Sequence, residues 1–214
     1  MHDAAMTISV ILGHPHAGSF NHAIASQVVT ALKSAGHLVA FHDLYLEGFD
    51  PLITGYELAT DDVGSNALVE RHCQELRQAE GIVIIHPNWW GMPPAILKGW
   101  VDRVFRPGVA YEFADGDDGS GIPTGLLQAR AALVLTTSNT SDGRERQVFG
   151  DPLETIWRNC IFGFCGITKV IRRNFSVIIG STNEQRAGWI AETATIVRQV
   201  FDPARAVAND QGVA

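Results

Sequence analysis

The sequence predicts an α/β protein built on one doubly wound sheet of five parallel strands in the order 2-1-3-4-5. Short runs of apolar and β-branched residues alternate with longer segments in which apolar residues recur every three or four positions, the patterns of buried strands and amphipathic helices. A chain of 214 residues without repeats or linkers fits a single domain. Helical crossovers between parallel strands are right-handed, and 2-1-3-4-5 is the simplest order that they allow.

The composition is that of an ordinary soluble globular protein and argues against two classes of partner. The chain is 46% hydrophobic and 18% charged, and 16 basic against 23 acidic residues give a net charge of -7. A negative surface disfavours nucleic acids and anionic membranes. No apolar run approaches the roughly 20 residues that cross a bilayer, and MHDAAMTISV lacks the features of a signal peptide. We therefore expect a cytoplasmic protein with no stable membrane insertion and no nucleic-acid partner.

The first predicted unit is a strand over Thr7 to Gly13, a loop with the sequence HPHAGSFN, and a helix from about Asn21 to Ala35. A helix N-terminus offers free backbone N–H groups and the positive end of its dipole to an anion. This first loop has no Walker A lysine and no glycine triplet. The residues from Gly18 to Asn21 would therefore bind a phosphate through backbone amides and short polar side chains.

The histidines of the first loop suggest a metal site and the cysteines suggest thiol chemistry, but the sequence supports neither. His14 and His16 flank Pro15, but no third ligand stands at a suitable spacing, so we expect no metal site. Three cysteines are too few for a disulfide framework. Cys160 and Cys165 fall within a helical pattern, where we expect both to be small buried residues.

The next segments supply the second and the central strand. Leu38 to Leu44 predicts a strand parallel to the first. The chain from Tyr45 to Ser65 is acidic and lacks periodicity, which is typical of a functional or mobile surface loop. A helix over Asn66 to Ala79 then leads into Gly81 to Ile85, whose unbroken apolar run indicates a strand buried on both faces.

Two tryptophans follow the central strand. Trp89, Trp90 and Gly91 form a loop at its carboxyl end, before Pro93 and Pro94 open an amphipathic helix. Ligands of open α/β sheets bind at this end of the strands, and two flat aromatic side chains suit a flat ligand. The alternative, on position alone, is that both tryptophans of this tryptophan loop belong to the hydrophobic core.

A fourth strand brings a polar segment to the same edge. Ala131 to Thr137 is another continuous apolar run, and it ends in the threonine loop, Thr136 to Thr140. We favour a ligand-binding role for this loop over simple hydrogen bonding within it, because its strand ends at the same crevice.

The last segments complete the sheet. The sequence DPLE at 151–154 predicts a helix with an acidic N-cap, proline at the first position and glutamate at the third. Thr168 to Phe175 is a more polar run whose two arginines suit an edge strand. Thr182 and Gln185 predict the capping box of a last helix, and residues 204–214 have no pattern that could bury a face, so we expect a disordered tail.

Four stretches of the chain resemble a known family. Pro87 to Trp90, PAILKGW at 94–100, DRVF at 102–105 and GVAY at 108–111 closely resemble the NAD(P)H:quinone oxidoreductase family of flavodoxin-like flavoproteins. The resemblance extends over nearly the whole chain. It implies a flavodoxin-like fold, a single flavin-binding domain over residues 1–203, and a short form without the C-terminal extension of longer members.

The resemblance also implies an activity, cofactors and site residues. It implies a flavin-dependent NAD(P)H oxidoreductase that reduces quinones, or azo and nitro compounds, by ping-pong hydride transfer in a homodimer. The flavin would be FAD, with FMN as the alternative, and NAD(P)H the electron donor. The implied catalytic residues are Trp90 and, reaching the substrate from the partner subunit, Tyr111 and Phe113. The implied cofactor-binding residues are His14, Gly18, Ser19, Phe20, Asn21, Pro87, Asn88, Trp89, Trp90, Gly91, Thr136, Thr137, Ser138 and Asn139.

The chain departs from the family after the threonine loop. The best-studied members place a tyrosine and a histidine there to take up charge on the reduced flavin, whereas SDGRERQVFGDP has no tyrosine and has Phe149 where the histidine would fall. Backbone amides, Arg144 or Arg146, or water would then balance that charge. An alternative function with the same fold and loops is a flavin-bearing, redox-sensing regulatory subunit of a membrane transport system.

Overall fold

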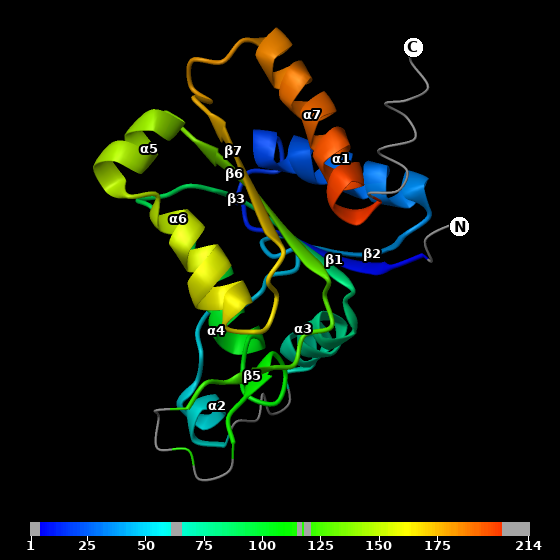
Figure 1. Ribbon diagram of the computed structural model, residues 1–214, viewed down its shortest axis with the longest axis vertical. Helices are drawn as coiled ribbons and strands as arrows, with labels where there is room; N and C mark the ends of the chain where they lie inside the picture. The colour runs from blue at the N-terminus through cyan, green and yellow to red at the C-terminus, as the bar shows by residue number, and fades with distance from the viewer. Residues whose placement is uncertain (1–4, 61–65, 115–116, 118–120, 203–214) are drawn as a thin grey trace.

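A computed structural model of the chain describes residues 5–60, 66–114, 117 and 121–202 (Figure 1). Its main sheet has five strands in the order β2-β1-β3-β6-β7, all parallel. Counted among the long strands alone, this is the predicted 2-1-3-4-5 order, so the flavodoxin-like fold is confirmed. The expected disordered tail and most of the glycine- and aspartate-rich segment near residue 117 lie outside the described residues.

The strands lie where the apolar runs predict them. β1 covers Thr7–Leu12, β2 Leu38–Asp43, β3 Gly81–Pro87, β6 Ala131–Ser138 and β7 Val170–Ser176. β3 and β6 are buried at every residue, because helices cover both faces of the sheet at its centre. β4, Tyr111–Glu112, and β5, Thr124–Gly125, form a separate antiparallel pair.

Two helical layers enclose the sheet (Figure 1). Helices α1, Phe20–Ala35, and α7, Asn183–Phe201, pack side by side over one face. Helices α3, Ala67–Gln78, and α4, Ala95–Val104, share the other face with a π-helix, η1, over Ile156–Gly163. Within the described residues, no helix combines the length and the apolar character needed to cross a bilayer.

The predicted helix start at Asp151 and Pro152 is confirmed in position, but the expected cap by the Asp151 side chain is absent. Asp151 has a left-handed φ of 48° and its side chain caps no backbone N–H. The carboxylate instead pairs with the guanidinium of Arg172 on β7. The helix that follows is only the short α6, Pro152–Thr155, which continues directly into η1. A charge from a neighbouring strand has therefore overridden the local capping signal.

Two short helices were not predicted. α5, Asp142–Phe149, has Glu145 as its only buried residue, so it carries no apolar stripe that a sequence pattern could reveal. α2, Gly55–Thr60, lies within the segment expected to be irregular. Its Glu57 is buried and pairs with Arg103 of α4 at 2.8 Å, which anchors the segment to the α4 side of the sheet.

Two further expectations need correction. Cys160 is exposed, whereas Cys165 is buried as expected. Helix α4 begins at Ala95, so Pro94 stands at the cap position and not at the first helical position. By contrast, the capping box of Thr182 and Gln185 at the start of α7 is confirmed, with both of its hydrogen bonds present.

Candidate functional site

The carboxyl ends of β1, β3 and β6 form one continuous edge. The N–H of Gly13 donates to the carbonyl of Ile85 at 2.9 Å, and the N–H of Asn88 donates to the carbonyl of Thr137 at 2.7 Å. The ring centroids of His14 and Trp89 lie 6.3 Å apart. The first loop, the tryptophan loop and the threonine loop are thus brought together, at the end of the sheet where this class of fold binds ligands.

The first loop presents the N-terminus of α1. Ser19 is the N-cap, and its hydroxyl oxygen accepts the N–H of His22 at 3.3 Å. The Nδ1 of His14 accepts the N–H of His16 at 3.1 Å, so the ring proton of a neutral His14 is on Nε2. Burial lowers the pKa of His14, which favours this neutral form. Gly18 is exposed in the same loop.

Asn21 and Phe20, at the end of the first loop, differ in the groups that they offer to a ligand. Asn21 is buried and donates from Nδ2 to the hydroxyl of Thr137 at 2.9 Å, while its Oδ1 has no hydrogen-bond partner in the described part of the chain. A buried acceptor without a donor is costly and points to a bound group or water. The ring of Phe20 packs against Phe175 and Trp189, so what Phe20 can offer a ligand is its backbone N–H at the start of α1.

The tryptophan loop is held rigidly with its aromatic rings outward. Asn88 donates from Nδ2 to Glu145 at 3.1 Å and accepts the N–H of Gly91 at 2.9 Å. Trp90 has a left-handed φ of 59° and is 98% exposed, and Trp89 is 42% exposed. The alternative that these tryptophans form part of the core is therefore wrong. Gly91 has φ 74°, and a Cβ there would lie 2.7 Å from Pro152, so glycine is required.

His86 is a residue of this edge that the sequence analysis did not single out. It is buried at the end of β3, just before Pro87, which is itself buried. Its Nδ1–H donates to the carbonyl of Pro87 at 2.8 Å, and its Nε2 accepts the indole N–H of Trp157 at 2.9 Å. Burial lowers the pKa of His86 to about 4. The signal that could have identified it is a polar residue within an otherwise apolar strand.

Most hydrogen-bonding side chains of the threonine loop are already paired with other groups of the protein. The hydroxyl of Thr136 donates to Oδ1 of Asn174 at 3.0 Å, and the hydroxyl of Ser138 donates to the carbonyl of Thr140 at 2.7 Å. The side chain of Asn139 is exposed and accepts the N–H of Ile179 at 2.9 Å. Of this loop, Thr137 is the residue that contacts the first loop directly.

Charged residues follow the threonine loop in α5. The guanidinium of Arg144 lies over the ring of Phe149, with 5.4 Å between its central carbon and the ring centroid. Arg146 lines a polar pocket with Arg172, Asp142 and Asp151 at the carboxyl ends of β6 and β7. Arg146 therefore lies at the same edge of the sheet as the threonine loop, whereas Arg144 packs on Phe149 of its own helix.

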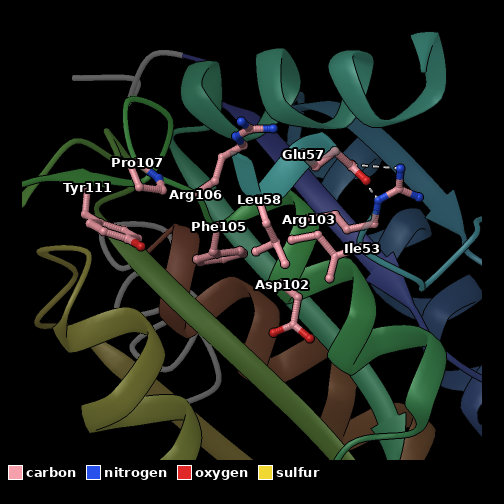
Figure 2. A pocket seen from close by; sticks show the side chains of 9 residues that line it. All are labelled: Ile53, Glu57, Leu58, Asp102, Arg103, Phe105, Arg106, Pro107 and Tyr111. Carbon is pink, nitrogen blue, oxygen red and sulfur yellow. Dashed lines mark hydrogen bonds and ion pairs between the residues drawn. The ribbon is translucent and has the colours of Figure 1, made fainter. Parts of the chain in front are cut away.

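Tyr111 and Phe113 lie in a separate cluster. Their ring centroids are 5.8 Å apart, and Tyr111 lies 4.9 Å from Phe164. Figure 2 shows Tyr111 on the rim of a pocket of about 270 Å³, opposite Ile53 and Leu58 of the α2 region. We call Ile53, Leu58, Tyr111, Phe113 and Phe164 the Tyr111 patch.

One further cluster has the composition of a metal site. Ligand atoms of His42, Glu47 and His72 lie within 4.8 Å of one another. The indole N–H of Trp100 donates to Nδ1 of His72 at 2.9 Å, and Nε2 of His72 contacts Glu47 at 3.0 Å. A tryptophan can only donate, so the proton of His72 is on Nε2, where a metal would have to bind. Burial lowers the pKa of His72 to about 4, so the ring is neutral and donates to Glu47.

The comparisons with known proteins agree with the flavodoxin-like fold of the chain. A family model described as a flavodoxin-like fold matches residues 6–195. The chain is 30% identical over 167 residues to an uncharacterized NAD(P)H oxidoreductase of Haemophilus influenzae, covering 75% of this chain and 79% of that protein. It is also 30% identical over 207 residues to NAD(P)H dehydrogenase [quinone] 1 of Cavia porcellus, covering 84% and 73%. The chain belongs to the NAD(P)H:quinone oxidoreductase family and is an oxidoreductase.

The solved structures support the same family fold. The crystal structure of Smu.1420 from Streptococcus mutans has a TM-score of 0.79 and 32% identity to this chain, and the match covers 91% of this chain and all of that one. Open α/β sheets bind ligands outside the carboxyl ends of their strands, and the three loops of this chain meet at that end of the sheet.

Proposed function

We propose that this oxidoreductase is a flavin-dependent NAD(P)H dehydrogenase that reduces quinones, or related azo and nitro compounds, by a ping-pong cycle at one shared site. The observation that carries the proposal is the meeting of three loops at one sheet edge with Trp90 fully exposed among them. An aromatic ring that buries nothing within its own chain is available to cover a flat ligand. The names of the Haemophilus influenzae and Cavia porcellus relatives support the reaction class.

The residues at the edge fit a flavin. When bound, the flavin would supply the hydride chemistry, accepting a hydride from NAD(P)H and passing it to the acceptor. Backbone amides of the first loop and the N-terminus of α1 would hold its phosphate. The unpaired Oδ1 of Asn21 would accept a hydrogen bond from a ligand N–H or O–H. Trp89 and Trp90 would lie along the ring system and exclude water from it.

His86 and Asn88 would keep the tryptophan loop in position. The two hydrogen bonds of His86 fix the carbonyl of Pro87 against Trp157 of η1. Asn88 ties the loop to Glu145 of α5. With these supports, the backbone amides of the loop would meet the ligand without reorganisation, which is how a preorganised polar edge contributes to catalysis.

The proposal includes a cytoplasmic homodimer that completes each pocket. Tyr111 and Phe113 lie in the Tyr111 patch of their own chain, where Phe113 and Leu58 are exposed. Their assigned role in substrate binding requires that they reach the site of a second copy. An interface over this patch would cover the exposed apolar side chains and place both rings at the partner's substrate pocket.

A steady-state assay of NADH and NADPH against menadione, with the bound flavin identified by mass, tests the proposal. We expect yellow protein, retained FAD or FMN, and turnover with at least one nucleotide. Colourless protein whose added flavin is neither retained nor bleached by either nucleotide would overturn it. Flavin that is retained and reduced but passes electrons to no acceptor would favour the redox-sensing regulatory subunit.

A further inference from the structure

A chain of three hydrogen-bonded side chains supports the first loop. The hydroxyl of Ser19 lies 2.9 Å from Nδ1 of His22, and Nε2 of His22 lies 2.9 Å from Oδ2 of Asp43. Ser19 is the N-cap of α1, and Asp43 ends the neighbouring strand β2. The side chains of His22 and Asp43 are largely buried, so water competes weakly for these bonds.

The proton positions in this chain can be assigned from donor and acceptor chemistry. The other carboxylate oxygen of Asp43 accepts the backbone N–H groups of Tyr45 and Leu46 at 3.1 and 3.2 Å. An ionised carboxylate only accepts, so Nε2 of His22 must carry a proton. In a neutral His22, Nδ1 is then an acceptor. It takes the single hydroxyl proton of Ser19, whose oxygen also accepts the N–H of His22.

This assignment limits what Ser19 can do. While His22 is neutral, the Ser19 hydroxyl proton points at the imidazole and cannot be donated to an anion. A doubly protonated His22 donates from both ring nitrogens, to Asp43 and to the Ser19 oxygen. The Ser19 hydroxyl proton is then free to turn toward a phosphate at the N-terminus of α1.

We propose that His22 is a positioning residue that sets the direction of the Ser19 hydroxyl, and that binding of the flavin phosphate brings a proton onto His22. The inference rests on the proposed function and deepens it. Binding of a phosphate at the N-terminus of α1 adds a negative charge beside this chain of side chains, and an added negative charge favours protonation of a neighbouring base. No atom of His22 needs to touch the cofactor for this effect.

Three groups of the described chain face His22. Asp43 faces it from β2, Ser19 from its own helix, and His14 from the first loop, with 6.1 Å between the ring centroids of His14 and His22. Burial lowers the pKa of His14, so that ring is also neutral before a phosphate binds and is a second candidate for proton uptake. The variant His22→Gln, which keeps His14, separates the two rings. His16 is exposed in the same loop and serves as a control.

The test measures the dissociation constants of FAD and riboflavin between pH 6.5 and pH 9 by flavin fluorescence. The FAD diphosphate does not change its charge in this range, and riboflavin has no phosphate. We expect the Kd of FAD to rise with pH, by at most about tenfold per pH unit, because one proton is taken up on binding. The Kd of riboflavin should stay level. Calorimetry in two buffers at pH 8 should show uptake of about one proton per FAD.

Three variants separate the role of His22 from a structural one. His22→Gln should flatten the pH dependence of the FAD Kd and abolish the proton uptake. Ser19→Ala, which keeps the imidazole but removes the hydroxyl, should reduce both. His16→Gln, the same change in an exposed residue of the loop, should keep both. A level FAD Kd in the wild type, or a slope that survives in His22→Gln, would overturn the inference and leave the proposed function intact. Failure of every flavin to bind would overturn both.

Discussion

Trp90 combines full exposure with a left-handed backbone conformation. At 98% exposed it buries no apolar surface within its own chain, and φ of 59° is a strained conformation for a bulky side chain. Such strain persists only where the surrounding structure holds it. Here the loop is held by the bond from the N–H of Gly91 to Asn88 and by the paired backbone hydrogen bonds of Trp89 and Met92. Both features are consistent with a side chain whose partner is a ligand.

We expect Trp90→Ala to weaken flavin binding by roughly 1–3 kcal/mol, because that is the stacking energy of one base on one aromatic ring. The free energy of unfolding without flavin should change by less than about 0.5 kcal/mol. Flavin titration and urea unfolding measure the two quantities. The matched control is Trp100→Ala, which removes a tryptophan that is 1% exposed and should cost about 3–5 kcal/mol of stability. Full flavin affinity in Trp90→Ala would contradict the assigned role.

His86 should make the fold sensitive to acid. Its pKa is about 4 in the folded protein and 6.5 in the unfolded chain, because burial disfavours the charged ring. Above pH 6.5 the ring is neutral in both states. As the pH falls from 6.5 toward 4, only the unfolded chain takes up the proton, so the free energy of unfolding decreases, by about 3 kcal/mol in total.

Urea unfolding at pH 7 and pH 4.5 of the wild type and of His86→Gln checks this expectation. The variant should be less stable at pH 7 but should lose less stability on acidification. His16→Gln, which replaces an exposed histidine, should behave as the wild type does. The same acid sensitivity in His86→Gln and in the wild type would show that His86 is not the responsible group.

At the scale of single elements, Gly99 shows where tertiary packing outweighs helix propensity. It lies within α4, where alanine would normally be preferred by about 1 kcal/mol. A Cβ at Gly99, however, would lie 2.2 Å from the carbonyl oxygen of Pro51. The bare backbone at this position lets α4 approach the segment that follows β2.

We therefore expect Gly99→Ala to destabilise the protein by at least about 1 kcal/mol, since backbone and not a flexible side chain must move. Gly188→Ala is the matched control, because it lies within α7 and no atom would come within 4 Å of its new Cβ. That change should stabilise by about 0.5–1 kcal/mol. Urea unfolding measures the stability change of both variants. A stabilised Gly99→Ala variant would show that the backbone at Pro51 moves aside at little energetic cost.

The elements also show what local sequence can and cannot predict. The capping box of Thr182 and Gln185 was predictable because both of its hydrogen bonds lie within four consecutive residues. Asp151 carries the same kind of local signal, yet its carboxylate pairs with Arg172, 21 positions along the chain. A capping signal therefore holds only where no distant charge competes for the same side chain.

At the scale of the whole molecule, the sheet order and the three-loop edge could be predicted from sequence. The buried runs of β1, β3 and β6 are unmistakable, and parallel strands with helical crossovers must place their loops at one edge. His86 and the Ser19–His22–Asp43 chain could not be predicted. Their partners come from different elements, and only the folded register brings Trp157 to His86 or Asp43 to His22.

The oligomeric state depends on which apolar side chains a single chain leaves exposed. Trp100 and Phe105 are buried in the core of a single chain and offer no surface to a partner. The Tyr111 patch remains, with Leu58 exposed on α2 beside the pocket of Figure 2 and Phe113 packed edge-on against Tyr111. These exposed rings and aliphatic chains are contiguous, as an interface requires.

We predict that the protein sediments as a single dimeric species at low micromolar concentration and that Leu58→Glu converts it to a monomer. A charge introduced into an apolar two-fold interface must be buried twice, once from each copy, so its desolvation cost counts double. The monomer should lose reductase activity but keep its flavin, because the three loops that would hold the cofactor belong to one chain. Leu38→Glu is the control, since Leu38 is 66% exposed against 68% for Leu58 and opens β2 at the amino end of the sheet. A wild-type monomer with full reductase activity would overturn both the dimer and the roles assigned to Tyr111 and Phe113.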